Sequence, residues 1–81
     1  MDREEVFSKV ADICKEVFDD ESLEVTETSS AKDIEAWDSL THLDLISALE
    51  DTFQVSFTLE EFSGAKNLGE LVNYLMKHLS E

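Results

Sequence analysis

Apolar residues recur along this chain at intervals of three and four, the spacing that places them on one face of an α-helix. The pattern runs through three long segments, at residues 2–18, 39–53 and 67–79. The residues expected to form their buried faces are Val6, Phe7, Val10, Ile13, Cys14, Val17 and Phe18, then Leu45, Ile46, Ala48, Leu49 and Phe53, then Leu68, Leu71, Val72, Leu75 and Leu79. The pattern predicts three principal helices packed around a shared core.

Polar residues three apart indicate where helices begin. The pairs with the spacing of capping residues are Asp2 and Glu5, Thr58 and Glu61, and Asn67 and Glu70. The middle pair predicts a fourth, short helix, whose length Gly64 limits. We expect Leu59, Phe62 and Ala65 to face inward from this short helix.

Residues 19–37 form a long connection between the first two long helices. Leu23, Val25 and Ile34 are expected to hold it against the bundle, since a loop this long usually carries packed anchors or a function. The acidic run at 19–21 either solvates the loop or weakly holds a divalent ion. It lacks the ligand spacing and the glycine of a calcium-binding loop.

Composition supports a folded chain and restricts its partners. Of the 81 residues 42% are apolar, proline is absent and glycine occurs twice, which favours long helices over disorder or tight β-turns. We predict an all-α four-helix bundle, three main helices and one short, with a long loop between the first two, as a single domain over residues 1–81. Twenty acidic against six basic residues give a net charge of −14, which argues against nucleic acid and anionic membranes and favours partners with basic patches. With no apolar run near transmembrane length and no signal peptide, we expect a cytoplasmic monomer.

The helix predicted at 39–53 is the segment from which a function can be inferred. Asp38 is a good N-cap, so Ser39 would be the first helical residue, exposed above the positive end of the helix dipole. The residues of this helix that point away from the buried stripe are Leu40, Leu43, Asp44, Ser47, Glu50 and Asp51. Apolar residues ringed by acids on an exposed face indicate a docking surface for a partner.

A catalytic site is not predicted from these residues. His42 is expected to be a structural histidine, and a contact between Ser39 and His42 would lack the orienting third group of a hydrolase. His78 lies near a helix end that we expect to fray. Cys14 falls within a buried stripe, so its thiol is expected to be inert. Trp37 either packs as a hydrophobic staple near position 42 or flanks the docking surface.

The tripeptide Asp38-Ser39-Leu40 at a helix start resembles the modification site of acyl carrier proteins. The residues that follow in the order typical of that family are Leu43, Leu45, Ile46, Ala48, Leu49, Glu50 and Phe53. The likeness extends over residues 3–79, because the later helices also fit. The resemblance implies an acyl-carrier-like bundle and a carrier with no catalytic activity of its own.

In acyl carrier proteins the serine matching Ser39 receives a 4′-phosphopantetheine arm from coenzyme A, and the thiol of that arm carries an acyl group as a thioester. A separate phosphopantetheinyl transferase catalyses the attachment with magnesium. An anionic phosphate at this helix start would gain from the dipole and from free N–H groups. The resemblance thus implies covalent phosphopantetheine on Ser39.

The resemblance also implies which residues meet partner enzymes. Asp38 and Leu40 correspond to contacts of the transferase. The face that acyl-loading, acyl-transfer or synthase enzymes would read comprises Leu43, Asp44, Ser47, Glu50 and Asp51. The stripe of Leu45, Leu49 and Phe53 resembles the wall along which family members shelter an acyl chain.

The chain departs from the usual family pattern near this site. Thr41 stands where carriers of fatty acid synthesis usually have an acid, and Ser47 where they often have a larger apolar residue. Trp37 replaces a small residue, and His42 is not the usual residue there. These departures suggest a specialised lipid, polyketide or acyl-transfer pathway. The alternatives are an aminoacyl or D-alanyl carrier, although the Gly-Gly-x-Ser lead of many peptidyl carriers is missing, and an unmodified acidic helical interaction module.

Overall fold

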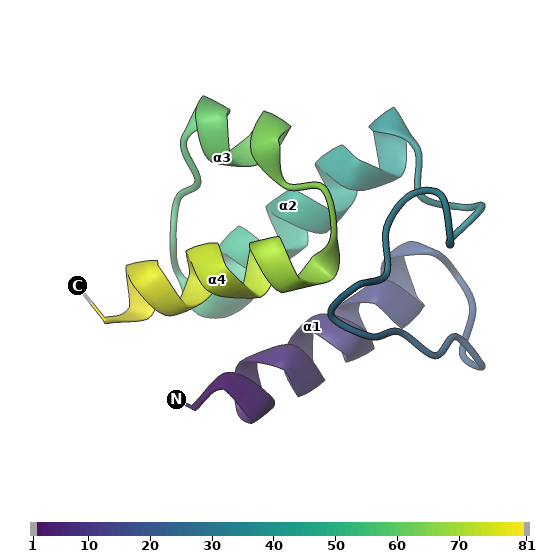
Figure 1. Ribbon diagram of the computed structural model, residues 1–81, viewed down its shortest axis with the longest axis horizontal. Coiled ribbons are helices and arrows are strands. Elements are labelled where there is room, and N and C mark those ends of the chain that lie inside the picture. The colour runs from purple at the N-terminus through teal and green to yellow at the C-terminus, as the bar shows by residue number, and fades with distance from the viewer. Residues whose placement is uncertain (1, 81) are drawn as a thin grey trace.

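Four α-helices make up the computed structural model, which describes residues 2–80. They are α1 (Arg3–Val17), α2 (Ser39–Phe53), α3 (Leu59–Gly64) and α4 (Leu68–Leu79). α1 packs against both α2 and α4, and the short α3 sits to one side of these three, as Figure 1 shows. Between residues 2 and 80 the β-type pairing is confined to an isolated bridge that joins Ser30 to Asn67. The predicted bundle of three long helices and one short helix, with a long first loop, is confirmed.

The predicted helix starts are confirmed by their caps. The side chains of Asp2, Thr58 and Asn67 accept hydrogen bonds from the backbone N–H groups of Glu5, Glu61 and Glu70, at 2.9, 3.1 and 2.9 Å respectively. These bonds satisfy N–H groups that have no partner inside the helix. Local polar residues therefore decide where α1, α3 and α4 begin.

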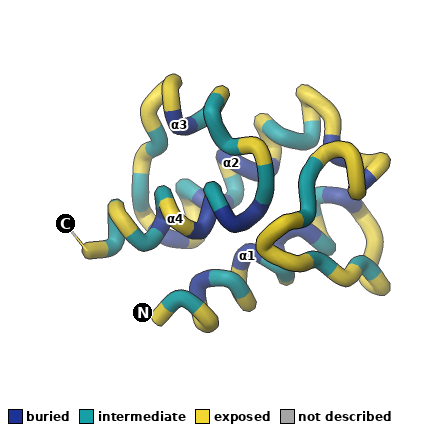
Figure 2. Tube along the Cα trace, in the orientation of Figure 1, coloured by how far each residue is buried: buried dark blue, intermediate teal, exposed yellow. Residues whose placement is uncertain are grey.

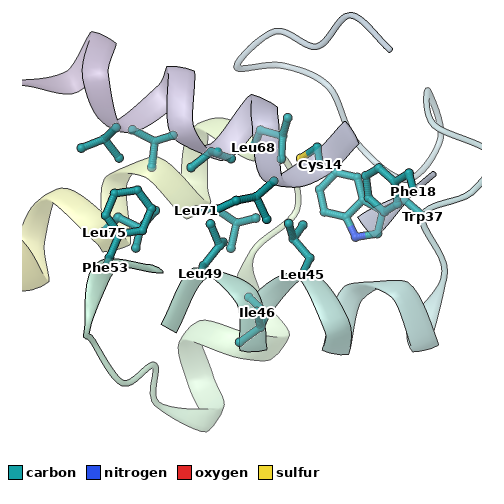
Figure 3. Close-up of a cluster of buried hydrophobic side chains, with 14 of the residues drawn as sticks. Cys14, Phe18, Trp37, Leu45, Ile46, Leu49, Phe53, Leu68, Leu71 and Leu75 are labelled. Atoms are coloured by element: carbon teal, nitrogen blue, oxygen red, sulfur yellow. The ribbon is translucent and has the colours of Figure 1, made fainter. Parts of the chain in front are cut away.

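The core lies between α1, α2 and α4, as the buried segments in Figure 2 show. The larger side chains with no exposed surface come from all three helices: Val6, Val10, Cys14, Leu45, Leu49, Leu68, Leu71, Val72 and Leu75. In Figure 3, Leu45 and Leu49 point toward Leu71, while Trp37 and Phe18 close one end of the cluster. Fully burying a leucine side chain stabilises a fold by about 2 kcal/mol, so this shared core is the main source of stability.

The long first loop is packed onto the bundle. Ile34 is buried, and Leu23 and Val25 are partly buried against the core, as predicted. The N–H of Gly69 donates to the carbonyl oxygen of Glu27 at 2.7 Å, and a Cβ at position 69 would lie 2.9 Å from that oxygen. Glycine is therefore required at position 69 by the close approach of the loop.

Arg3 adds a polar connection between the loop and two helices. Its guanidinium pairs with the carboxylate of Glu27 in the loop and donates to Asn73 Oδ1 of α4 at 2.7 Å. The pKa of Arg3 is raised and that of Glu27 is lowered, in each case chiefly by their mutual hydrogen bond. This contact was not predicted, because Arg3 and its partners are distant in sequence.

The prediction for α3 is partly wrong. Leu59 does not face inward: its side chain is 81% exposed, whereas Phe62 and Ala65 are half-buried. The inward position belongs to Glu61, which accepts a hydrogen bond from the N–H of Thr58 at 2.9 Å. The same carboxylate lies 2.9 Å from Nε2 of His78, so His78 is held in place at the helix end that was expected to fray.

Candidate functional site

The start of α2 is built by a reciprocal capping box. Asp38 Oδ1 accepts from the N–H groups of Leu40 and Thr41, at 2.9 and 3.0 Å. In return Thr41 Oγ1 accepts from the N–H of Asp38 and donates to the carbonyl of Ala36, both at 2.7 Å. The N–H of Thr41 first, and that of Leu40 next, hold the pKa of Asp38 below its usual range. Sequence reasoning found the cap but missed the role of Thr41, since Glu or Gln usually completes such a box.

Ser39 lies where the sequence predicts it, as the first residue of α2, with its side chain exposed. In the part of the chain that the structure describes, no side chain or backbone group makes a hydrogen bond to its hydroxyl. Asp38 already fills the capping position, so the hydroxyl is not needed for the cap. Ser39 therefore presents a hydroxyl that is open to solvent.

The electrostatics of this helix start differ in one respect from the prediction. Asp38 occupies the N–H groups of Leu40 and Thr41, so of the free N–H groups expected here, that of Ser39 itself is the one without a partner among the described residues. This N–H and the positive end of the helix dipole remain available to an anion, and the first turn of α2 contains no acidic residue. An anionic group on Ser39 would gain from both.

A cleft of about 400 Å³ opens beside Ser39. Its walls come from the end of the first loop, the start of α2 and the end of α3, and are formed by Ala31, Trp37, Asp38, Ser39, His42, Phe62, Ser63, Ala65 and Lys66. Lys66 brings one of the chain's six basic residues into this cleft. The cleft is therefore mixed in character, with aromatic walls and a positively charged side chain.

His42 is a structural residue that joins three segments. Trp37 Nε1 donates to His42 Nδ1 at 3.0 Å, and His42 Nε2 lies 2.8 Å from the carbonyl oxygen of Phe62. Because Nδ1 accepts, Nε2 carries the proton and donates to Phe62. Both ring nitrogens are thus occupied, so neither holds the hydroxyl of Ser39 and a Ser–His pair is not formed. Trp37 is 5% exposed and packs at position 42, which confirms its predicted structural role.

The predicted docking face lies on the outside of α2. Leu40 is 75% exposed and Leu43 is 52% exposed, and Asp44, Ser47 and Asp51 are exposed beside them. Glu50 differs, because it is only half-exposed and its carboxylate accepts from the N–H of Phe57 at 2.8 Å. Glu50 therefore fastens the loop before α3 rather than standing free among the acids.

The exposed apolar surface extends beyond α2. Leu59 of α3 joins Leu40 and Leu43 as the third large apolar side chain that is exposed within residues 2–80. A groove of about 420 Å³ between α2 and α3 is lined by Leu43, Ile46, Ser47, Glu50, Phe57, Thr58, Leu59 and Phe62. The exposure of Leu59 was not predicted, because helical spacing places this residue on the inward face and α3 is only six residues long.

Other candidate chemistries find no support in the described residues. Among them no group of three His, Cys, Asp or Glu side chains could hold a metal ion. Asp20 instead accepts hydrogen bonds from the N–H and hydroxyl of Ser22. Cys14 has no exposed surface, and burial raises the pKa of its thiol to about 12. No helix in the same range is both long and apolar enough to cross a membrane.

Comparison with known proteins agrees with this arrangement. The family model described as the phosphopantetheine attachment site matches residues 8–75. The chain is 36% identical over 76 residues to an acyl carrier protein of Clostridium acetobutylicum, covering 94% of this chain and 99% of that protein. It is 37% identical over 79 residues to one of Rubrobacter xylanophilus, covering 96% of each. The solution structure of a holo acyl carrier protein from Geobacter metallireducens superposes with a TM-score of 0.86 at 40% identity, covering 93% of this chain and 86% of that one.

Proposed function

Since the chain belongs to the acyl carrier protein family, whose members carry phosphopantetheine and are carriers rather than enzymes, we propose that Ser39 is the residue that bears the arm. The family works with transferase and synthase enzymes. In this proposal a phosphopantetheinyl transferase attaches the arm to Ser39 from coenzyme A. The arm then holds acyl groups as thioesters and presents them to partner enzymes, with residues 1–81 acting as a single carrier domain.

The observation that carries the proposal is the exposed, unbonded hydroxyl of Ser39 at the start of α2. A transferase needs an accessible nucleophile, and the positive end of the dipole favours the phosphodiester that forms there. Lys66 in the adjoining cleft adds a cation in a chain of net charge −14. The residues present therefore fit a phosphate-linked arm.

Asp38 and Leu40 are proposed to contact the transferase on either side of Ser39. Leu40 is 75% exposed, and apolar side chains so exposed near a modified residue suit an enzyme surface. Asp38 has a structural role as well, because its carboxylate closes the cap of α2. Its side chain remains exposed on the outer side, where a basic group of the transferase could approach.

Partner enzymes are proposed to dock on the outer face of α2, formed by Leu43, Asp44, Ser47, Glu50 and Asp51. The acids would speed the approach of enzymes with basic patches and fix their register. The leucines would supply most of the affinity, because they are the apolar groups that association removes from water. Glu50 contributes less than its neighbours in this proposal, since it is engaged with Phe57.

The pathway proposed is a specialised lipid, polyketide or acyl-transfer pathway in the cytoplasm. Thr41, His42 and Trp37 are the departures that support it, and each has a structural task at the site. The hydroxyl of Thr41 completes the cap of α2 by accepting from the N–H of Asp38. The indole N–H of Trp37 donates a hydrogen bond to the imidazole of His42. The structure beside Ser39 therefore depends on residues that are unusual in the family, which supports a dedicated set of partners.

Two other functions remain to be separated from this one. An aminoacyl or D-alanyl carrier would use the same arm on Ser39 and differ only in its cargo. An unmodified interaction module would use Leu40, Leu43 and the acids without any arm. The mass of the protein after incubation with the transferase separates the module from both carriers.

The experiment incubates the full chain with coenzyme A, magnesium and a broad-specificity transferase, and measures the intact mass. One phosphopantetheine should be added to the wild type and none to Ser39→Ala, while the helical circular dichroism of that variant is retained. Ser56→Ala, at an exposed serine in the loop before α3, is the matched control and should be modified like the wild type. An unchanged mass of the wild type would favour the interaction module.

A further inference from the structure

The surface between α2 and α3 carries apolar side chains that the fold leaves uncovered. Leu43 on α2 and Leu59 on α3 are exposed leucines that line the groove of about 420 Å³ between these helices. Ile46, Phe57 and Phe62 line the same groove and are buried or half-buried. The groove therefore has a deeper apolar part and an exposed leucine on each of the two helices.

Leu59 contributes little to the fold. The side chain of Thr58 caps α3 by accepting from the N–H of Glu61, whose carboxylate accepts from the N–H of Thr58 in return. The contact of Glu61 with His78 attaches α3 to α4. Neither contact involves Leu59, so glutamine or lysine at position 59 would serve the helix equally well. A large apolar side chain exposed at such a position, beside an apolar groove, indicates a surface that another molecule covers.

Ser47 provides room in the groove. It lies one helical turn after Leu43 and nearly one turn before Glu50, so these three residues form a single stripe along α2. Its side chain is the smallest among the residues that line the groove. The space beside this small side chain is sufficient for one large apolar side chain of another protein.

The charge around the groove favours a cationic partner. From residue 39 to residue 65 the sequence contains five acidic residues and no lysine or arginine. Asp44 and Asp51 are exposed on α2 and Glu60 is exposed on α3, so acids lie on both helices that form the groove. A second copy of this chain, with the same net charge of −14, would be repelled. A protein surface with lysine or arginine would be attracted.

The exposed leucines also favour a protein over the cargo of the arm. An acyl chain in the deeper part of the groove would cover Ile46 and Phe62 and leave the outer sides of Leu43 and Leu59 in water. It would gain nothing from the acids, because it is uncharged. A protein surface can cover both leucines and place cations near the acids, and an apolar centre with a polar rim is the usual arrangement of a protein interface.

We propose that the groove between α2 and α3 receives one large apolar side chain of a partner enzyme, presented between lysine or arginine residues. Leu43 and Leu59 pack against that side chain from the two helices, and Ser47 leaves the space that it fills. This rests on the proposed function, since the partner is an enzyme that the carrier visits, and it extends the docking face of α2 onto α3.

The test measures binding of a defined probe to the full, unmodified chain by nuclear magnetic resonance titration. The probe is a synthetic helical peptide with one stripe of leucine flanked by lysine, and two control peptides replace the leucines by alanine or the lysines by glutamate. The leucine–lysine peptide should shift the amide signals of Leu43, Ser47 and Leu59 and bind at least about tenfold more tightly than either control. Equal affinity for the leucine and alanine peptides would indicate attraction by charge alone and overturn the inference.

Substitutions in the chain test the groove itself. Ser47→Leu fills the space and should weaken binding of the leucine–lysine peptide at least about tenfold, while Leu59→Ala should weaken it about fivefold. Thr52→Leu adds the same leucine at an exposed position of α2 that does not line the groove, and should bind as the wild type does. Circular dichroism verifies that each variant is folded. Unchanged affinity in Ser47→Leu and Leu59→Ala would overturn the inference.

The outcomes separate this inference from the proposed function, because the titration needs no arm. A chain that the transferase modifies but whose groove binds no peptide would overturn the inference alone. A chain that stays unmodified and binds the peptide in the groove would contradict the carrier function and leave the docking site supported. An octanoyl arm that shifts the signals of Leu43 and Leu59 relative to an acetyl arm, and blocks the peptide, would assign the groove to the cargo and overturn the inference.

Discussion

Glu61 of α3 and His78 of α4 lie 2.9 Å apart, Oε1 to Nε2, although 17 residues separate them in the chain. The Glu61 carboxylate also accepts the N–H of Thr58, and it is almost fully buried. The hydrogen bond from Thr58 first, and the contact with His78 after it, hold the pKa of Glu61 below its usual range. One carboxylate thus both starts α3 and attaches it to α4.

Replacing Glu61 by Gln should lower the free energy of unfolding near neutral pH by about 1–2 kcal/mol, because a charge-assisted contact is lost. A carboxyl group with a lowered pKa stabilises the fold above its unfolded pKa of about 4.3, and this contribution is lost as the pH falls through the folded pKa. Urea unfolding of both proteins at several pH values should show their stabilities converging in acid. Glu60→Gln, at the exposed neighbouring residue, is the control. A difference independent of pH would contradict this assignment.

Replacing Asp38 by Ala should lower the Tm by about 5 °C, because α2 loses the acceptor for the N–H groups of Leu40 and Thr41. Asp38→Asn keeps a capping oxygen and should melt close to the wild type. The lowered pKa of Asp38 means that the wild type loses this advantage over Asp38→Ala as the pH falls through that pKa. Equal melting temperatures for Asp38→Ala and the wild type near neutral pH would show that the cap does not stabilise the fold.

Cys14 should not react with iodoacetamide in the native protein at mildly alkaline pH. Its thiol has no exposed surface, and burial raises its pKa to about 12, so the reactive thiolate is scarce. The same reagent should label the thiol fully in denaturant. Mass spectrometry before and after unfolding measures both, and rapid labelling of the native protein would contradict the predicted burial.

Leu59 and Leu45 should respond very differently to truncation. Leu59→Ala should change the free energy of unfolding by less than about 0.5 kcal/mol, because the side chain is 81% exposed. Leu45→Ala should cost about 2–5 kcal/mol, because it leaves a cavity in the core. Urea unfolding of the two variants measures this contrast. A large loss of stability in Leu59→Ala would contradict the exposure of that side chain and indicate that it packs against the core.

Reversing the charge of Asp44 or Asp51 should lower kcat/KM of the transferase about tenfold at low salt, because electrostatic steering is lost. The loss should shrink as salt is added, since screening weakens the approach of the wild type as well. Asp12→Lys, at an exposed position on α1, changes the net charge equally and is the matched control. Similar losses in all three variants would indicate a general effect of charge rather than a docking face on α2.

Much of the fold could be predicted because it depends on local signals. Helical spacing placed Leu45, Leu49 and Phe53 inside and Leu40 and Leu43 outside, and the structure confirms both faces. Membership of the acyl carrier protein family was inferred from Ser39 and the residues that follow it, and the comparisons confirm it. Spacing works here because the three long helices each bury one continuous stripe.

The same reasoning fails where packing between distant segments decides the outcome. α3 has only six residues, fewer than two helical turns, so the spacing of apolar residues does not define its buried face. The spacing therefore predicted that Leu59 faces inward and did not identify Glu61 as the buried residue. The contact of His42 with the carbonyl of Phe62 depends on how α3 crosses α2, which no local pattern records. The pairing of Arg3 with Glu27 likewise depends on the path of the long loop.

The central claim is most directly tested by locating the group that the transferase adds. The full chain is incubated with coenzyme A and magnesium, digested, and sequenced by fragment mass spectrometry. One phosphopantetheine per chain, on Ser39, is the predicted result. A group on any other serine, or a chain that stays unmodified, would contradict it.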